Sequence, residues 1–115
     1  MPHRDWKIRI NDMLNALEAI RLYTQNMNFD DFIADRKTVD AVVRNLIIIG
    51  EAASRLPDDI SMNYPGIPWY EMRGMRNFVI HEYFGISDKI LWETVQSDLP
   101  PLVPQLKQIL DRTQD

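Results

Sequence analysis

The chain has 115 residues, of which 45% are hydrophobic and 26% are charged, and its formal net charge is −4 with a pI near 5.1. This length suits one compact domain over residues 1–115, and the composition is that of a folded globular chain. Because there is no cysteine, disulfides, thiolate metal sites and cysteine nucleophiles are excluded. The acidic balance argues against a broad face that binds nucleic acid, although the 13 Lys and Arg residues can still form a local cationic cleft.

The N-terminal segment, MPHRDWKIRIND, is charged throughout and lacks the apolar core of a signal peptide. No apolar run approaches the roughly 20 residues needed to span a bilayer. We therefore expect a cytoplasmic protein with no membrane partner. The two histidines, His3 and His81, are far apart, so we expect no zinc cluster and no other metal or cofactor, and His3 is assigned no role.

The first half of the chain predicts two long helices. Apolar residues recur at steps of three and four from Asp5 to about Gln25, which is typical of an amphipathic helix. NMNFDD (residues 26–31) is expected to be a linker, and a second helical pattern follows over residues 36–55. The run at 46–49 would favour a strand, but the uninterrupted helical period outweighs four residues of propensity. This second helix is apolar nearly all round, which predicts that it is central or covered by a second subunit.

The second half of the chain is punctuated by proline. Prolines and a glycine within residues 57–68 predict a loop with one short helical turn at 58–64. Pro68 suits the first turn of a helix that runs to His81 or Tyr83, and Ser87 suits the N-cap of a final helix. The prolines within residues 100–104 require that final helix either to bend or to stop and restart. The chain is thus predicted to form an all-α bundle of four to five helices.

One segment, GMRNFVIHEYF (residues 74–84), places Arg76 and His81 five positions apart among apolar residues. At about 100° per residue, these two side chains would lie about 140° apart on one regular helix. They can meet if Arg76 reaches round, if the helix unwinds near His81, or if two copies of the helix pair across a dimer axis. Twofold pairing would place two arginines and two histidines in one groove.

Arg76 and His81 together suit phosphodiester chemistry. A histidine that titrates near neutrality can take a proton from a hydroxyl or give one to a leaving oxygen. A guanidinium can bind a phosphate through two hydrogen bonds and neutralise charge that develops in the transition state. Because RNA supplies its own nucleophile in the 2′-hydroxyl, a metal is not obligatory. By spacing alone a hydrogen-bonded core histidine is the commoner outcome, so further matches are needed before the pair indicates catalysis.

The whole stretch resembles the signature of the HEPN superfamily, specifically the HepT-like toxins of prokaryotic toxin–antitoxin pairs. The pattern of that family is Arg, four residues, His, one residue, Tyr, which Arg76, His81 and Tyr83 meet, and Asn77 is the polar residue usual after the arginine. The resemblance covers most of the chain, because it extends to IGEAASRLP (49–57), PGIPWYEMRGMRN (65–77) and WETVQSDLPPL (92–102).

The resemblance implies a helical homodimer whose motifs meet at the subunit interface and form a metal-independent ribonuclease, with tRNA among its targets. It implies that Arg76 and His81 are the catalytic pair and that Asn77 helps to orient them. The implied partner is a minimal nucleotidyltransferase antitoxin, which can join the toxin in a larger complex and transfer AMP to Tyr83. A bulky anion there would block the groove and compete for the guanidinium. The alternatives are a non-catalytic subunit that binds the nucleotidyltransferase, and an orphan helical dimer without activity.

Two charged residues outside the motif are further candidates. Glu51 could be an inward acid that contacts Arg44 or Arg55, a cleft residue near the motif, or one half of a salt bridge on a helix surface. Arg73 lies one turn before Asn77, so it is a candidate for RNA binding that would extend the phosphate path. The alternative for Arg73 is a solvated charge at the rim.

Aromatic and acidic residues near helix starts have simpler interpretations. Trp69, Tyr70 and Trp92 could stack on bases, but core packing is favoured for the tryptophans, because each has apolar neighbours. The three aspartates within residues 30–35 resemble a metal cluster only superficially. Acids at helix starts are favoured by the helix dipole, so these need no metal.

Overall fold

The computed structural model describes residues 4–82 and 87–112, with side chains over 5–77 and 87–112. Every regular element within these ranges is helical, so the predicted all-α fold is confirmed, but the described residues form seven α-helices and one π-helix where four to five helices were predicted. None of the described helices combines the length and apolarity needed to cross a membrane. The elements are α1 (Arg4–Thr24), α2 (Phe29–Ala34), α3 (Arg36–Ser54), α4 (Asp58–Asn63), α5 (Trp69–Glu82), α6 (Asp88–Glu93), the π-helix η1 (Thr94–Asp98) and α7 (Leu102–Arg112).

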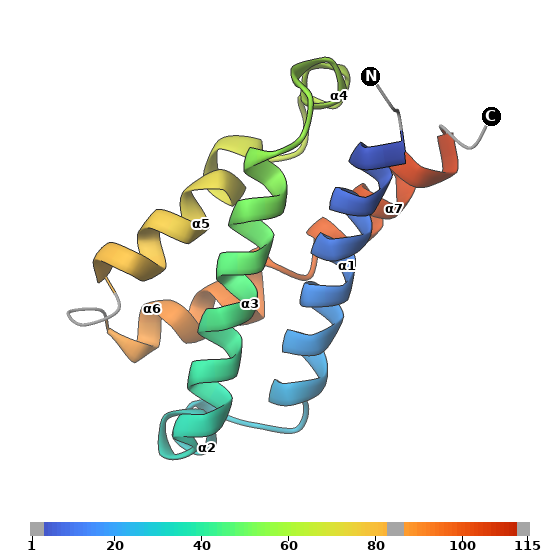
Figure 1. The fold of residues 1–115 in the computed structure, drawn as a ribbon. Coiled ribbons are helices and arrows are strands. Elements are labelled where there is room, and N and C mark those ends of the chain that lie inside the picture. The colour runs from blue at the N-terminus through green and yellow to red at the C-terminus, as the bar shows by residue number, and fades with distance from the viewer. Residues whose placement is uncertain (1–3, 83–86, 113–115) are drawn as a thin grey trace.

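Helix α3 lies at the centre of the fold, between α1 and α5, while α7 packs against α1 (Figure 1). The inward residues of α3, such as Val42, Leu46 and Ile49, are almost completely buried. The prediction of a helix rather than a strand is therefore confirmed, and so is the central position, which was one of the two explanations for its apolar surface. Burial on two sides explains why a helix can be apolar nearly all round, because each side needs its own apolar stripe.

The segment expected to be a linker at 26–31 contains the start of a helix, so that prediction was wrong for its second half. Asn26 has a φ of 64°, which turns the chain after α1. The Asn28 side chain accepts a hydrogen bond from the Asp31 backbone at 2.8 Å, and the Asp31 carboxylate accepts one from the Asn28 backbone at 3.2 Å. This capping box starts α2, and Phe32 is fully buried against Trp92 with ring centroids 5.0 Å apart.

The final helix stops and restarts, which is one of the two predicted outcomes. Ser87 caps α6 as expected, accepting a hydrogen bond from the Lys89 backbone at 3.1 Å. The helix then widens into η1, where the Leu99 N–H donates to the Thr94 carbonyl at 3.1 Å. Prolines at 100 and 101 cannot continue the ladder, and α7 begins directly after them.

Candidate functional site

Helices α3 and α5 are in close backbone contact at Gly50 and Arg76. A Cβ atom placed on Gly50 would lie 2.6 Å from the Arg76 backbone nitrogen and 3.0 Å from the Arg76 Cβ. Only a residue without a side chain fits there, so Gly50 allows the backbone of α5 to rest directly on α3. The contact sets the position of α5 along α3 and brings Arg76 level with Glu51, the next residue on α3.

Arg76 and Glu51 form an ion pair between the two helices. The Arg76 Nη1 donates to the Glu51 Oε1 at 2.9 Å, and the two side chains are 38% and 39% exposed. The Arg55 Nε lies farther away, 3.8 Å from the Glu51 Oε2. The hydrogen bond from Arg76 lowers the pKa of the Glu51 carboxyl below its ordinary value, against the smaller opposing effect of burial. Glu51 is therefore ionised at neutral pH and holds the guanidinium by charge as well as by geometry.

A groove with a volume of about 1070 Å³ runs beside Arg76, between α5 and the segment from Ile90 to Leu102. Arg76 and Asn77 lie next to each other on its α5 wall, and Asn77 is exposed. We call this hollow the α5 groove. It combines cationic, acidic, amide, hydroxyl and apolar groups, and the residues that line it include Tyr70, Glu71, Arg73, Arg76, Asn77, Ile90, Thr94, Ser97, Asp98 and Pro101.

Three of the predicted site residues, Arg73, Arg76 and Asn77, thus line one groove. Arg73 Nε also donates to the Ala53 carbonyl at 3.4 Å, which ties this side chain to the C-terminal turn of α3. The backbone of α5 is helical through Glu82, so the helix does not unwind at His81. The side chain of His81 and all of Tyr83 lie outside the described residues, and their relation to Arg76 stays a prediction.

Two of the interpretations of Glu51 hold together. Its hydrogen bond goes to Arg76, 25 positions away, which places it beside the motif, and it also forms the longer ion pair with Arg55 within α3. Spacing along α3 predicts only contacts within that helix, such as the one to Arg55, so no local pattern identified this partner. No local pattern identified Thr94 and Ser97 either, because only the packing of η1 brings them to the α5 groove.

Both tryptophans among the stacking candidates pack with the core, as predicted. Trp69 is buried, and its indole N–H donates to the Tyr64 carbonyl at 3.0 Å. Trp92 is half-buried against Phe32. Tyr70 differs, because its side chain is 83% exposed and lines the α5 groove. Of the three aromatic candidates for stacking on a base, only Tyr70 has the ring exposure that stacking requires.

The three aspartates within residues 30–35 lie at helix starts, as predicted, and two of them make capping hydrogen bonds. Asp31 closes the capping box of α2, and the Asp35 carboxylate caps α3 by accepting from the Thr38 backbone at 3.2 Å and the Thr38 hydroxyl at 2.8 Å. The hydrogen bonds from Thr38 lower the pKa of the Asp35 carboxyl. Among the described residues, no group of three or more His, Asp or Glu side chains is arranged to hold a metal ion.

Residues 13–109 match the family described as Ribonuclease HepT-like. The chain belongs to this family. It is 41% identical to a probable ribonuclease HepT of Thermococcus cleftensis over 107 residues, which are 93% of this chain and 94% of that protein. Putative RNases of Methanocaldococcus jannaschii and Caldanaerobacter subterraneus subsp. tengcongensis are each 38% identical, over 96% and 90% of this chain and 91% and 92% of the relatives. No solved structure gives a significant match. The family resemblance drawn from the motif is confirmed.

Proposed function

We propose that this chain is a metal-independent RNA endonuclease, the toxin of a toxin–antitoxin pair, with tRNA among its substrates. The observation that carries the proposal is the half-exposed Arg76 guanidinium, which Glu51 anchors on the wall of the α5 groove beside Asn77. The names of the relatives support the reaction, because several are called ribonucleases or putative RNases.

The proposed reaction uses a nucleophile from the RNA itself. The 2′-oxygen attacks the adjacent phosphorus and loses its proton, the bond from phosphorus to the 5′-oxygen breaks, and the leaving oxygen takes a proton. A 2′,3′-cyclic phosphate and a 5′-hydroxyl remain. His81 serves as the general base or acid, Arg76 neutralises charge on the phosphate oxygens in the transition state, and Asn77 helps to orient the pair. Because neither nucleophile activation nor charge neutralisation needs a cation in this scheme, EDTA should not stop the reaction.

Cleavage of total RNA in excess EDTA tests this proposal. Wild-type protein should remove specific bands in the size range of tRNA, and His81→Ala should remove none. His3→Ala is the matched control, because it deletes the only other histidine and should cleave like wild type. If His81→Ala cleaves as fast as wild type, His81 is not catalytic. If wild type does not cleave and intact mass excludes AMP on Tyr83, the alternative of a non-catalytic binding subunit is favoured.

The proposal includes a homodimer in which the motifs of two copies form one site. Val43, Ile47 and Ile48 border a shallow surface on the outer face of α3, and both isoleucines are only partly buried. An apolar surface of this kind suits a covering subunit. Pairing of the two motifs would also bring His81 of one copy towards Arg76 of the other, whereas the two side chains are about 140° apart on one regular helix. Sedimentation at micromolar concentration tests this step, and a monomer would exclude a groove built from two motifs.

Control by the antitoxin is the last part of the proposal. A minimal nucleotidyltransferase would bind the toxin in the cytoplasm and transfer AMP from ATP to the Tyr83 hydroxyl, with release of pyrophosphate. The added phosphate would compete for the Arg76 guanidinium, which gives the modification a physical route to inactivation. Incubation with the cognate nucleotidyltransferase and ATP should add the mass of AMP to wild type and not to Tyr83→Phe. Equal labelling of both proteins would place the acceptor elsewhere.

A further inference from the structure

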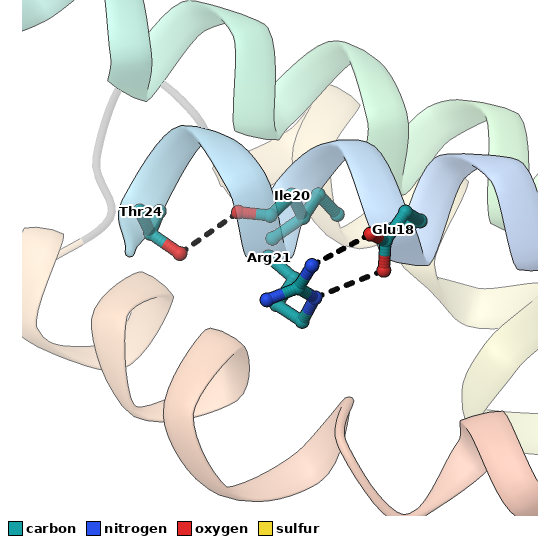
Figure 2. Close-up of polar contacts among 4 residues, drawn as sticks. All are labelled: Glu18, Ile20, Arg21 and Thr24. Atoms are coloured by element: carbon teal, nitrogen blue, oxygen red, sulfur yellow. Dashed lines mark hydrogen bonds and ion pairs between the residues drawn. The ribbon is translucent and has the colours of Figure 1, made fainter. Parts of the chain in front are cut away.

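The contact between Glu51 and Arg76 differs from an ordinary surface ion pair. Glu18 and Arg21 provide the comparison, since Arg21 donates to both carboxylate oxygens of Glu18 at 2.9 and 2.7 Å within one exposed turn of α1 (Figure 2). The pair of Glu18 and Arg21 forms wherever α1 is helical, because the two residues are three positions apart. Glu51 and Arg76 are 25 positions apart, and they meet because Gly50 allows α5 to rest on α3.

The position of Glu51 is electrostatically unfavourable for a site that binds phosphate. A carboxylate 2.9 Å from the Arg76 guanidinium offsets part of its positive charge and repels an incoming phosphate. Partly exposed ion pairs contribute little to the stability of the fold, so stability alone does not explain why Glu51 lies beside Arg76. The contact does restrict the long arginine side chain, which otherwise samples many rotamers. A fixed guanidinium can neutralise developing charge without reorganising at the moment of reaction.

We infer that Glu51 is a positioning residue, which acts on RNA cleavage by holding the Arg76 guanidinium in the α5 groove before the scissile phosphate arrives. The inference rests on the proposed function. It assigns to Glu51 no contact with RNA and no proton transfer. Its effect should therefore appear in kcat, which reports stabilisation of the transition state, and not as weaker substrate binding.

Steady-state cleavage of a short RNA by Glu51→Ala and Glu51→Gln tests the inference. In Glu51→Ala, kcat should fall by about 10-fold to 100-fold because the guanidinium is misplaced. KM should stay level or fall, because a negative charge near the phosphate is gone. Glu51→Gln keeps an acceptor oxygen for the Arg76 Nη1, so it should recover most of the lost kcat. Glu18→Ala removes the comparison pair on α1, Glu18→Gln keeps one acceptor for Arg21, and both should leave kcat and KM unchanged.

A readout that does not depend on cleavage is the mobility of the arginine itself. Nitrogen-15 NMR of the Arg76 guanidinium should show restricted rotation in wild type and Glu51→Gln, and free rotation in Glu51→Ala. Circular dichroism shows whether each variant is folded. The NMR measurement remains informative even if wild type proves inactive on RNA. Inactivity would refute the proposed function, but not the effect of Glu51 on the mobility of Arg76.

Three outcomes would overturn the inference. If the kcat of Glu51→Ala equalled that of wild type, the contact between Glu51 and Arg76 would have no effect on the reaction. Equal losses in Glu51→Ala and Glu51→Gln would show that the acceptor geometry does not matter. A raised KM at unchanged kcat would indicate that Glu51 contributes to substrate binding, because uniform binding alone would then be lost.

Discussion

The contact at Gly50 predicts an unusual response to a small substitution. Gly50→Ala would place a Cβ atom 2.6 Å from the backbone nitrogen of Arg76, where ordinary contacts are 3.4 to 4 Å. A backbone atom cannot rotate away, so α3 and α5 would have to move apart locally by roughly 1 Å, and such overpacking costs about 1–3 kcal/mol. Alanine regains about 0.8–1 kcal/mol of helix propensity. We expect a net loss of about 1 kcal/mol in the free energy of unfolding, or about 4 °C in Tm.

Gly74→Ala is the matched control, because Gly74 lies in α5 with nothing within 4 Å of the added Cβ. Because the added Cβ atom meets no clash, only the higher helix propensity of alanine acts, and the free energy of unfolding of Gly74→Ala should rise by up to about 1 kcal/mol. Urea unfolding followed by circular dichroism measures both variants under the same conditions. The same substitution should thus have opposite signs at the two positions. If Gly50→Ala were as stable as wild type, with an unchanged dependence on urea, the close packing of α3 on α5 would be refuted.

Two further predictions concern the packing of the core and the pH dependence of stability. Phe32→Ala should lower the free energy of unfolding by about 3–5 kcal/mol, because a fully buried ring against Trp92 is lost, and a loss under about 1 kcal/mol in urea unfolding would contradict this packing. The folded-state pKa values of Asp35 and Glu51 are lowered, so their stabilisation is present above the ordinary carboxyl range and is lost as pH falls through the folded values. As the pH falls from about 6 to 2, the Tm of Asp35→Asn should therefore decrease less than the Tm of wild type. Parallel curves of Tm against pH would contradict the role of Thr38 as the partner of Asp35.

Predictions from the sequence succeeded where the signal was local and repeated. The apolar steps at Ile10, Met13 and Ile20 predicted α1, and all three side chains are almost completely buried. Proline placed the break before α7, because a residue without an N–H cannot continue the helical ladder wherever it lies. Ser87 was identified as an N-cap for a similar reason, since its hydrogen bond spans only two residues.

The same reasoning missed α2, whose start depends on a reciprocal pair of hydrogen bonds within a short polar segment. The apolar part of α2 is too short to show a helical period, and its one fully buried residue, Phe32, finds its partner Trp92 far along the chain. A short helix of this kind is stabilised by tertiary packing more than by its own propensity. Periodicity therefore could not distinguish it from a linker.

The sequence by itself determined the helical class, the family and the residues of the motif, because these depend on residue order and on spacing along one chain. Only the tertiary structure decided that Glu51 faces Arg76 and that Gly50 is the reason they meet. Contacts between helices depend on how far one helix slides along the other, and spacing within a single helix contains no information about that distance. The polar partner of the motif arginine therefore became visible only when α5 was packed on α3.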